Sequence, residues 1–216
     1  MNHETLFEAI RGGDETRIKA LLHEDPALYG ARAGGVSPVL YACYTGHASL
    51  APILLPVGSA LDFGEACALG DFARVQELDA ADPSCINTFT ADGFPPLGLA
   101  IFFRHPELAR YLIERGADVQ AHAQNPQRVA PIHAAAAVSD RATAALLLER
   151  GADVDARQQG GFTALHAAAG NGDTGMVELL LAAEADPSLV TDDGKVAADI
   201  ARERGHASLA DRLQTT

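Results

Sequence analysis

TALHAAAGNGD, residues 163–173, is a short alanine-rich segment that ends in a glycine turn and an acid. Because alanine is the best helix former, most of this segment is predicted to be a short helix. The next segment, TGMVELLLAAEA, residues 174–185, places Val177, Leu180 and Leu181 on one stripe at i, i+3 and i+4. That spacing is typical of an amphipathic helix. Together the two segments predict a pair of helices joined by a tight turn.

The same segment recurs along the chain at a nearly constant period. Seven copies begin near residues 4, 37, 61, 95, 130, 163 and 196, at intervals of 33, 24, 34, 35, 33 and 33 residues. Five residues after each start stands an alanine: Ala9, Ala42, Ala66, Ala100, Ala135, Ala168 and Ala201. Seventeen residues after each start stands a leucine: Leu21, Leu54, Leu78, Leu112, Leu147, Leu180 and Leu213. A repeated unit of this length indicates a solenoid.

A polar residue stands at the turn between the two helices in every copy. These residues are Asp14, His47, Asp71, His105, Asp140, Asp173 and His206. Polar side chains at such a turn can bond the free backbone groups where one helix ends and the next begins. After the second helix, extended segments such as RGADVQA and RGADVDA lead to ADG or GG turns before the next start.

Two of the copies resemble a known family. APIHAAAAVSD, residues 130–140, and TALHAAAGNGD resemble the ankyrin repeat, which has a period of about 33 residues and a T-P-L-H-x-A signature. The resemblance implies an all-α fold, an ankyrin-repeat solenoid of stacked antiparallel helix pairs with projecting β-hairpin loops that form a concave face. Because it covers essentially the whole chain, we expect a single ankyrin-repeat domain over residues 1–216, with the first and last units as caps.

One interval departs from the period. The 24 residues between Ser37 and Leu61 are nine fewer than the 33 of the interval before them, a deficit the size of one hairpin loop. LLPVGSALDF, residues 54–63, is therefore expected to run straight from the second unit into the third. The second hairpin is predicted to be shortened, which would leave a notch in the row of hairpins.

Composition and charge exclude several classes of partner. With 48% hydrophobic residues and a mean hydropathy of +0.03, the chain has the make-up of a soluble protein with a buried core. Its formal net charge of -13 would repel nucleic acid and anionic membranes, so neither is an expected partner. The N-terminal residues lack the apolar core of a secretory signal, and no apolar run is long enough to span a bilayer. A cytoplasmic location is expected.

Residue types that could carry chemistry fall mostly in repeat columns. Five of the eight histidines do so: His133 and His166 at the fourth motif position, and His47, His105 and His206 at the turn. A residue reused in register needs no ligand to explain it, so a framework role is favoured. The chain has no HExxH, GxSxG, P-loop or GxGxxG pattern. We expect no metal, no cofactor and no catalysis; the alternative is a hydrolase or metal-dependent site that uses His105, His133 and Asp140.

Cysteines and acids are interpreted in the same way. Cys43 and Cys67 share a column next to the repeated alanine and are predicted to be small core residues. No CxxC pair predicts a disulfide or a zinc site. Asp118, Asp153 and Asp186 recur after the second helix and are predicted to serve turns and solubility. The alternative is an acidic face that selects a basic partner.

The family resemblance also implies which positions contact a partner. In ankyrin repeats, binding uses the hairpin residue just before the motif and the two residues that end the first helix. Carried over by position, the predicted partner-binding residues are Val36, Tyr44, Leu69, Phe94, Phe102, Phe103, Val129, Val138 and Phe162. Four of the eight phenylalanines are among them, and clustered exposed aromatics usually mark an interface. Phe94 and Phe103 could instead pack as additional core.

These patterns predict a non-catalytic protein–protein interaction module that binds an unidentified protein in its concave groove, as an adaptor, an inhibitor or a sequestering protein. Side chains on stacked helices are already ordered, so little entropy is lost when a partner docks. A monomer is expected. The alternative is a structural protein that self-associates through the same groove to form a dimer.

Overall fold

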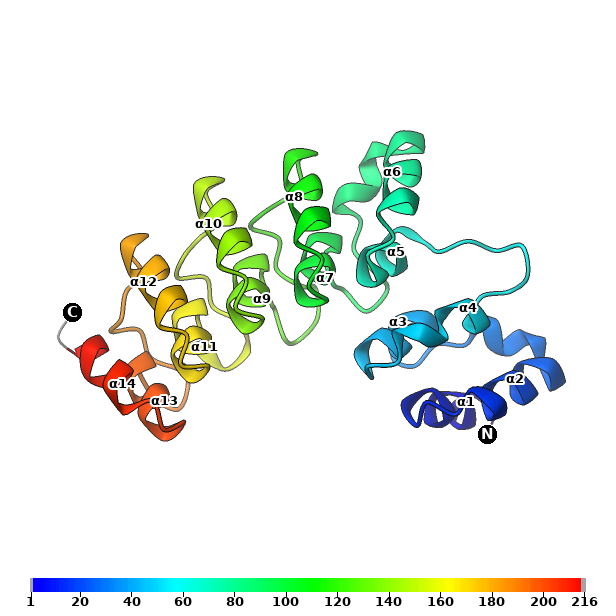
Figure 1. Cartoon of the computed structure of the whole chain (residues 1–216), viewed down its shortest axis with the longest axis horizontal. Coiled ribbons are helices and arrows are strands. Elements are labelled where there is room, and N and C mark those ends of the chain that lie inside the picture. Colours follow the sequence, from blue (N-terminus) through cyan, green and yellow to red (C-terminus); the bar gives the residue numbers. More distant parts are fainter. Residues whose placement is uncertain (1, 215–216) are drawn as a thin grey trace.

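The computed structural model describes residues 2–214, so residues 1, 215 and 216 of the expected domain lie outside the described part. Within residues 2–214 the chain forms fourteen α-helices, arranged as seven pairs that follow one another along an arc (Figure 1). The loops of this part contain a single isolated β-bridge, between Ala33 and Val36. The predicted all-α solenoid of stacked helix pairs is confirmed.

The first helices of the seven pairs are α1 (Asn2–Arg11), α3 (Pro38–Tyr44), α5 (Phe63–Leu69), α7 (Pro96–Phe102), α9 (Pro131–Ala137), α11 (Ala164–Gly170) and α13 (Ala197–Glu203). The second helices are α2 (Glu15–Glu24), α4 (Ala51–Leu54), α6 (Phe72–Ala81), α8 (Pro106–Glu114), α10 (Arg141–Glu149), α12 (Thr174–Ala182) and α14 (Ala207–Gln214). Four 3₁₀ turns accompany them: η1 (Pro26–Gly30), η2 (Ala48–Leu50), η3 (Pro83–Asn87) and η4 (Gln159–Gly161). Among these residues, no helix is long and apolar enough to cross a membrane.

The two repeated columns explain how the pairs stack. Ala100, Ala135 and Ala168 have no exposed surface, because the small side chain lets neighbouring first helices approach closely. The leucine column anchors the second helices: Leu112 and Leu147 are also fully buried. Each pair thus covers one face of the next and leaves the hairpin side of the first helices open.

The turn column has two roles that depend on the residue type. Asp14, Asp71, Asp140 and Asp173 cap the second helices, each accepting a backbone N–H three residues ahead at 2.9–3.0 Å, as predicted. Histidine does not cap in this way. The Nε2 atoms of His47 and His105 instead bond carbonyl oxygens of the preceding unit, at 3.1 Å and 3.0 Å.

The hairpins form a hydrogen-bonded row. Each one from the third onward is closed by a backbone bond, for example from the N–H of Thr90 to the carbonyl of Phe94 at 3.0 Å. Neighbouring hairpins are joined by backbone bonds of 2.7–2.9 Å, donated by Gln124 to Gly93, by Gln159 to Gln127 and by Asp192 to Gly160. The row is therefore a stiff edge along the open side of the first helices.

The second hairpin is shortened, as predicted. Helix α4 has only four residues, and residues 55–62 lead directly to α5 as a loop that projects from the stack (Figure 1). The expected notch, however, does not stay open. A Cβ atom on Gly35, in the first hairpin, would lie 2.8 Å from the carbonyl oxygen of Ala91, in the third. The first and third hairpins are in contact because no second hairpin lies between them, so the row of hairpins is continuous.

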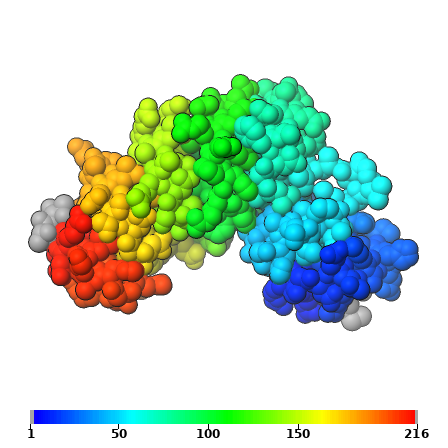
Figure 2. Space-filling view, in the orientation of Figure 1, coloured from blue at the N-terminus to red at the C-terminus, as the bar shows by residue number. Residues whose placement is uncertain are grey.

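The hydrophobic core falls into two clusters. One contains side chains of α1 to α4 and η1, including Leu6, Ile10 and Ile18, and the other extends from α3 to α14. Helix α3 joins them: Val39 belongs to the first cluster and Leu40 to the second. The space-filling view shows the resulting arch, with the first and last units at its two ends (Figure 2).

Candidate functional site

A groove of about 780 Å³ lies between the hairpin row and the exposed side of the first helices. Its lining comes from α3, α7, α9 and α11 together with four hairpins. The lining residues are Val36, Tyr44, Asp92, Phe94, Pro95, Gly98, Leu99, Phe102, Asn125, Pro126, Gln127, Val129, His133, Ala134, Ala137, Gln158, Gln159 and Ala167. Five of the nine predicted partner-binding residues are among them: Val36, Tyr44, Phe94, Phe102 and Val129. The volume is that of a typical ligand cleft.

An aromatic cluster builds one wall of the groove. The ring centroid of Tyr44 lies 6.1 Å from that of Phe94 and 5.6 Å from that of Phe103. The hydroxyl of Tyr44 donates to Oδ2 of Asp92 at 2.9 Å, which ties α3 to the third hairpin. Burial, and then the charge of Asp92, raise the pKa of Tyr44, so its hydroxyl remains a donor. This wall is therefore preorganised.

The sequence left open whether Phe94 and Phe103 face the groove or pack as additional core, and the exposure of their side chains bears on this choice. Phe102 is 49% exposed, whereas Phe94 and Phe103 are half-buried against the core. Phe103 does not line the groove but meets Phe102 edge to face, with 5.2 Å between the ring centroids. Phe102 is thus the exposed ring, and Phe103 supports it from the side.

Val138, another of the predicted partner-binding residues, is not part of the groove lining. Its side chain is only 8% exposed and belongs to the larger core cluster. The residue is the C-cap of α9 and precedes Ser139, which has a positive φ of 59°. Its carbonyl oxygen accepts a hydrogen bond from Nη1 of Arg104 at 2.8 Å, which joins this turn to that of the preceding unit.

Two further predicted residues lie beside the groove. Leu69, at the end of α5, is half-buried and packs against both core clusters, so it belongs to the junction between the second and third units. Phe162 is half-buried next to the fifth hairpin, and its ring centroid lies 5.7 Å from that of His166. Neither is part of the groove lining.

The prediction missed the polar side of the groove. Asp92, Asn125, Gln127, Gln158 and Gln159 come from hairpin tips, whereas the predicted site contains only one apolar residue per hairpin. Nδ2 of Asn125 donates to the carbonyl of Asp92 at 3.0 Å, so successive tips hold one another. Their position in the loop just before each motif was the one sequence feature that could have predicted them. The repeat register does not show which residues of a loop border the groove.

The histidine in the lining is a framework residue. Nδ1 of His133 accepts the N–H of Ala130 at 3.1 Å, and Nε2 donates to the carbonyl of Ala156 at 2.8 Å. His166 repeats the arrangement with Thr163 and Lys195. Burial lowers the pKa of both imidazoles, which keeps them neutral. Each ring thereby links its own helix start to the loop that enters the following unit.

The other residues of the alternative catalytic site are also engaged by the framework. Nε2 of His105 bonds the carbonyl of Ala68, and the carboxylate of Asp140 accepts both the N–H and the hydroxyl of Thr143. Among residues 2–214, no group of three His, Cys, Asp or Glu side chains could hold a metal ion. His105, His133 and Asp140 each have framework hydrogen-bond partners.

The cysteines and loop acids have the roles that their columns predicted. Cys43 and Cys67 are buried, and burial raises the pKa of Cys43 to about 12, so its thiol stays protonated. Asp118, Asp153 and Asp186 each accept the N–H two residues ahead, at 2.8–3.0 Å. These carboxylates shape the turns that follow the second helices.

Comparison with protein families agrees with this geometry. Models of ankyrin repeats match residues 6–125 and 63–158 (three copies) and residues 147–201 (many copies). A search of curated proteins found no match. Ankyrin repeats are in general protein–protein interaction modules without enzymatic activity. Since the matched segments span most of the chain, this protein belongs to the ankyrin-repeat family.

Proposed function

We propose that this protein is a non-catalytic interaction module that holds one protein partner in the groove between its first helices and its hairpins. The observation that carries the proposal is Phe102, a ring 49% exposed in a mainly apolar groove of about 780 Å³. A large exposed ring with a rigid support is the usual anchor of an interface. The stacked hairpins and the bond between Tyr44 and Asp92 support it further, because a preordered wall loses little entropy on docking.

The remaining features of the proposal follow from the repeats. The chain acts as a single ankyrin-repeat domain over residues 1–216, with the first and last units as caps. Binding is itself the activity, as an adaptor, inhibitor or sequestering protein, with no cofactor and with neither nucleic acid nor membrane as partner. We propose a cytoplasmic monomer.

The test is a comparison of two exposed phenylalanines. Proteins captured from the native host on the wild-type chain are identified, and their affinities are measured for wild type, Phe102→Ser and Phe72→Ser. Phe72 is 38% exposed on α6, away from the groove, and is the matched control. We expect Phe102→Ser to weaken binding at least tenfold and Phe72→Ser to leave it unchanged. A partner that binds all three proteins equally would contradict the proposal.

Stability measurements separate a lost contact from a damaged fold. Phe102→Ser should change the free energy of unfolding by less than about 1 kcal/mol, because the ring is exposed. Phe103→Ser should cost about 2 kcal/mol of unfolding free energy, because that ring packs on Tyr44 and on the core.

Light scattering on the same variants tests self-association. A dimer that Phe102→Ser dissociates would favour the alternative of a self-associating structural protein.

A further inference from the structure

We propose that the occupant of the groove is an extended segment of a partner protein that carries a bulky apolar side chain and, beside it, a lysine or arginine. This inference rests on the proposed function and specifies the chemistry of the partner. It comes from three features of the lining: an apolar floor, a rim of free amides, and one carboxylate without a cation.

The floor offers a place for one large apolar side chain. Phe94, Pro95, Leu99 and Phe102 all line the groove; Leu99 is buried, whereas Phe102 is 49% exposed. Contact with these rings removes apolar area from water on both partners, which is the main source of affinity in such a cleft. A wholly polar segment would leave this floor exposed.

The rim can recognise a main chain. Gln127, Gln158 and Gln159 line the groove, and no hydrogen bond joins their side chains to another group within residues 2–214. Each primary amide can donate and accept at once, which matches the N–H and C=O groups of an extended peptide. The backbone bond from Gln159 to Gln127 fixes the spacing of the two tips. A helix satisfies its own backbone groups and would leave these amides unused.

The carboxylate of Asp92 supplies the charge preference. It is half-buried and accepts two neutral hydroxyls, of Tyr44 at 2.9 Å and of Thr90 at 2.6 Å. Within the described residues it forms no ion pair. The other titratable side chains of the lining, Tyr44 and His133, are both kept neutral by burial, which raises the pKa of Tyr44 and lowers that of His133. A cationic side chain at this end of the groove would complete the site, and the overall charge of -13 attracts the same partner.

The same charges disfavour the other occupants. An acidic segment would meet both Asp92 and the long-range field of the chain. A second copy carries the same charge of -13, and its projecting loop, LPVGSALD at residues 55–62, contains no lysine or arginine. The loop does expose Val57, so insertion of this loop into the groove of another copy is an outcome that the test must detect.

The first experiment is an unbiased peptide selection. A random library of linear 12-residue peptides is selected on the purified full chain, with counter-selection on Phe102→Ser. We expect the enriched peptides to combine an aromatic or large aliphatic residue with lysine or arginine at a preferred spacing. Enrichment of acidic peptides, of uncharged peptides, or of none that Phe102→Ser releases would overturn the inference.

The second experiment tests the charge pair directly. One selected arginine peptide and its Arg→Gln counterpart are titrated against wild type, Asp92→Asn and the exposed-loop control Asp193→Asn. Asparagine keeps an acceptor for Tyr44 and removes the charge. We expect the arginine peptide to lose about tenfold in affinity on Asp92→Asn, the glutamine peptide to lose less than twofold, and Asp193→Asn to match wild type. Equal losses for both peptides on Asp92→Asn would overturn the role of the carboxylate.

Failure of this inference and failure of the proposed function give different results. If a host protein binds in a manner sensitive to Phe102→Ser but no linear peptide does, the groove binds a folded surface and only the extended-segment inference is wrong. If neither binds, both proposals are wrong. If light scattering shows a dimer that Val57→Ser dissociates, the occupant is a second copy and the inference is wrong.

Discussion

At the residue scale, each histidine of the turn column packs against a glycine in the turn of the preceding unit. Glycines with positive φ precede the turn residue in five units. Each of the three turn histidines follows such a unit, whereas the unit after Gly46 has Asp71. The pairs are Gly13 with His47, Gly70 with His105, and Gly172 with His206, and a Cβ on any of these glycines would overlap the imidazole. Units that follow Arg104 or Ser139 have aspartate instead.

This pairing predicts a difference between two glycine substitutions. Gly70 and Gly46 both have positive φ, +72° and +81°, but no atom lies within 4 Å of a Cβ placed on Gly46. Gly46→Ala should therefore cost about 1 kcal/mol of unfolding free energy for its backbone alone. Gly70→Ala should cost about 2–3 kcal/mol, because His105 must also move and loses its bond to Ala68. Urea unfolding measures both, and equal losses would show that the imidazole contact contributes nothing.

The buried motif histidines predict a pH dependence. Burial lowers the pKa of His133 and His166 below the ordinary value of about 6.5. The unfolded chain then binds more protons than the folded one in this range, so their contribution is present above pH 6.5 and is lost as the pH falls below it. The urea midpoint should stay level from pH 8 to 7 and fall from about pH 6.5 to 5. Exchanging both for glutamine should flatten that fall, whereas exchange of the exposed His23 should not.

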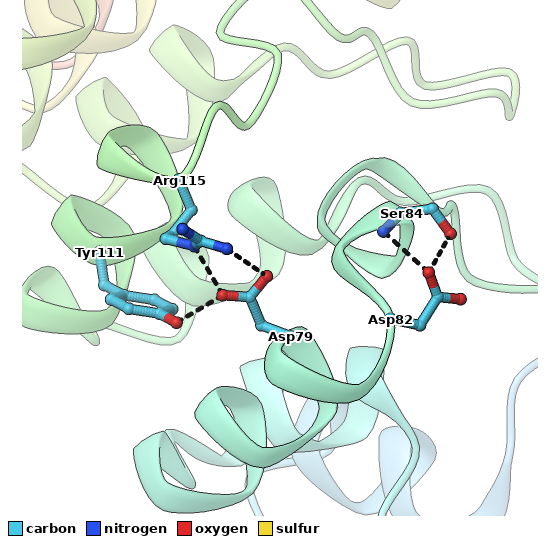
Figure 3. Close-up of polar contacts among 5 residues, drawn as sticks. All are labelled: Asp79, Asp82, Ser84, Tyr111 and Arg115. Atoms are coloured by element: carbon cyan, nitrogen blue, oxygen red, sulfur yellow. Dashed lines mark hydrogen bonds and ion pairs between the residues drawn. The ribbon is translucent and has the colours of Figure 1, made fainter.

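At the element scale, a buried carboxylate joins two second helices. Asp79 on α6 lies in a column that has Leu22, Ile113 and Leu148 in other units, yet its side chain is only 3% exposed. It accepts bonds from the hydroxyl of Tyr111 at 2.6 Å and from Nε of Arg115 at 2.7 Å, both at the end of α8 (Figure 3). These bonds lower the pKa of Asp79, so its stabilising contribution is present above about pH 3.9 and is lost as the pH falls through the folded-state pKa.

The two ends of this contact should respond unequally to mutation. Arg115→Gln leaves the buried carboxylate of Asp79 without its cation and should lower the free energy of unfolding more than Asp79→Asn does. Asp79→Asn leaves no buried charge and keeps an acceptor, so it should cost about 1 kcal/mol. Arg110→Gln, exposed on α8, is the control and should have little effect. Chemical unfolding at pH 7 measures all three, and a larger loss for Asp79→Asn would refute the argument.

At the scale of the whole molecule, the groove spans the junction between the two core clusters. Val36 and Tyr44 come from the second unit, whereas Phe94 and Phe102 come from the fourth. Both clusters contain residues of α3, and the hydrogen bond from the Tyr44 hydroxyl to Asp92 joins α3 to the third hairpin. In a solenoid each unit is stabilised only by its neighbours, so the junction sets how firmly the first two units are held.

Hydrogen exchange should reveal this division. We expect amides of α1 to α4 to exchange faster than those of α7 to α12, because fewer buried side chains hold them to the rest. Tyr44→Phe should accelerate exchange in α1 to α4 and leave α9 to α12 unchanged, and Tyr29→Phe is the control. Uniform protection along the chain, or no effect of Tyr44→Phe, would show that the junction is as firm as the other interfaces.

The sequence by itself determined the period, the helix pairs, the aspartate caps and the missing second hairpin. Each of these depends on residues close together in the chain, such as Asp173 and the N–H of Met176 three positions ahead. The repeat columns also located five lining residues, because a position in one unit has the same surroundings in the next.

Only the tertiary structure decided how distant units meet. It placed Gly35 against Ala91, with no hairpin between them, buried Val138, and made Gln127 and Gln159 part of the groove lining. It also supplied Arg115 to the buried Asp79, which the sequence pattern marks only as a polar residue in an apolar column. These outcomes depend on the relative placement of segments 30 or more residues apart, and local periodicity carries no information about that placement.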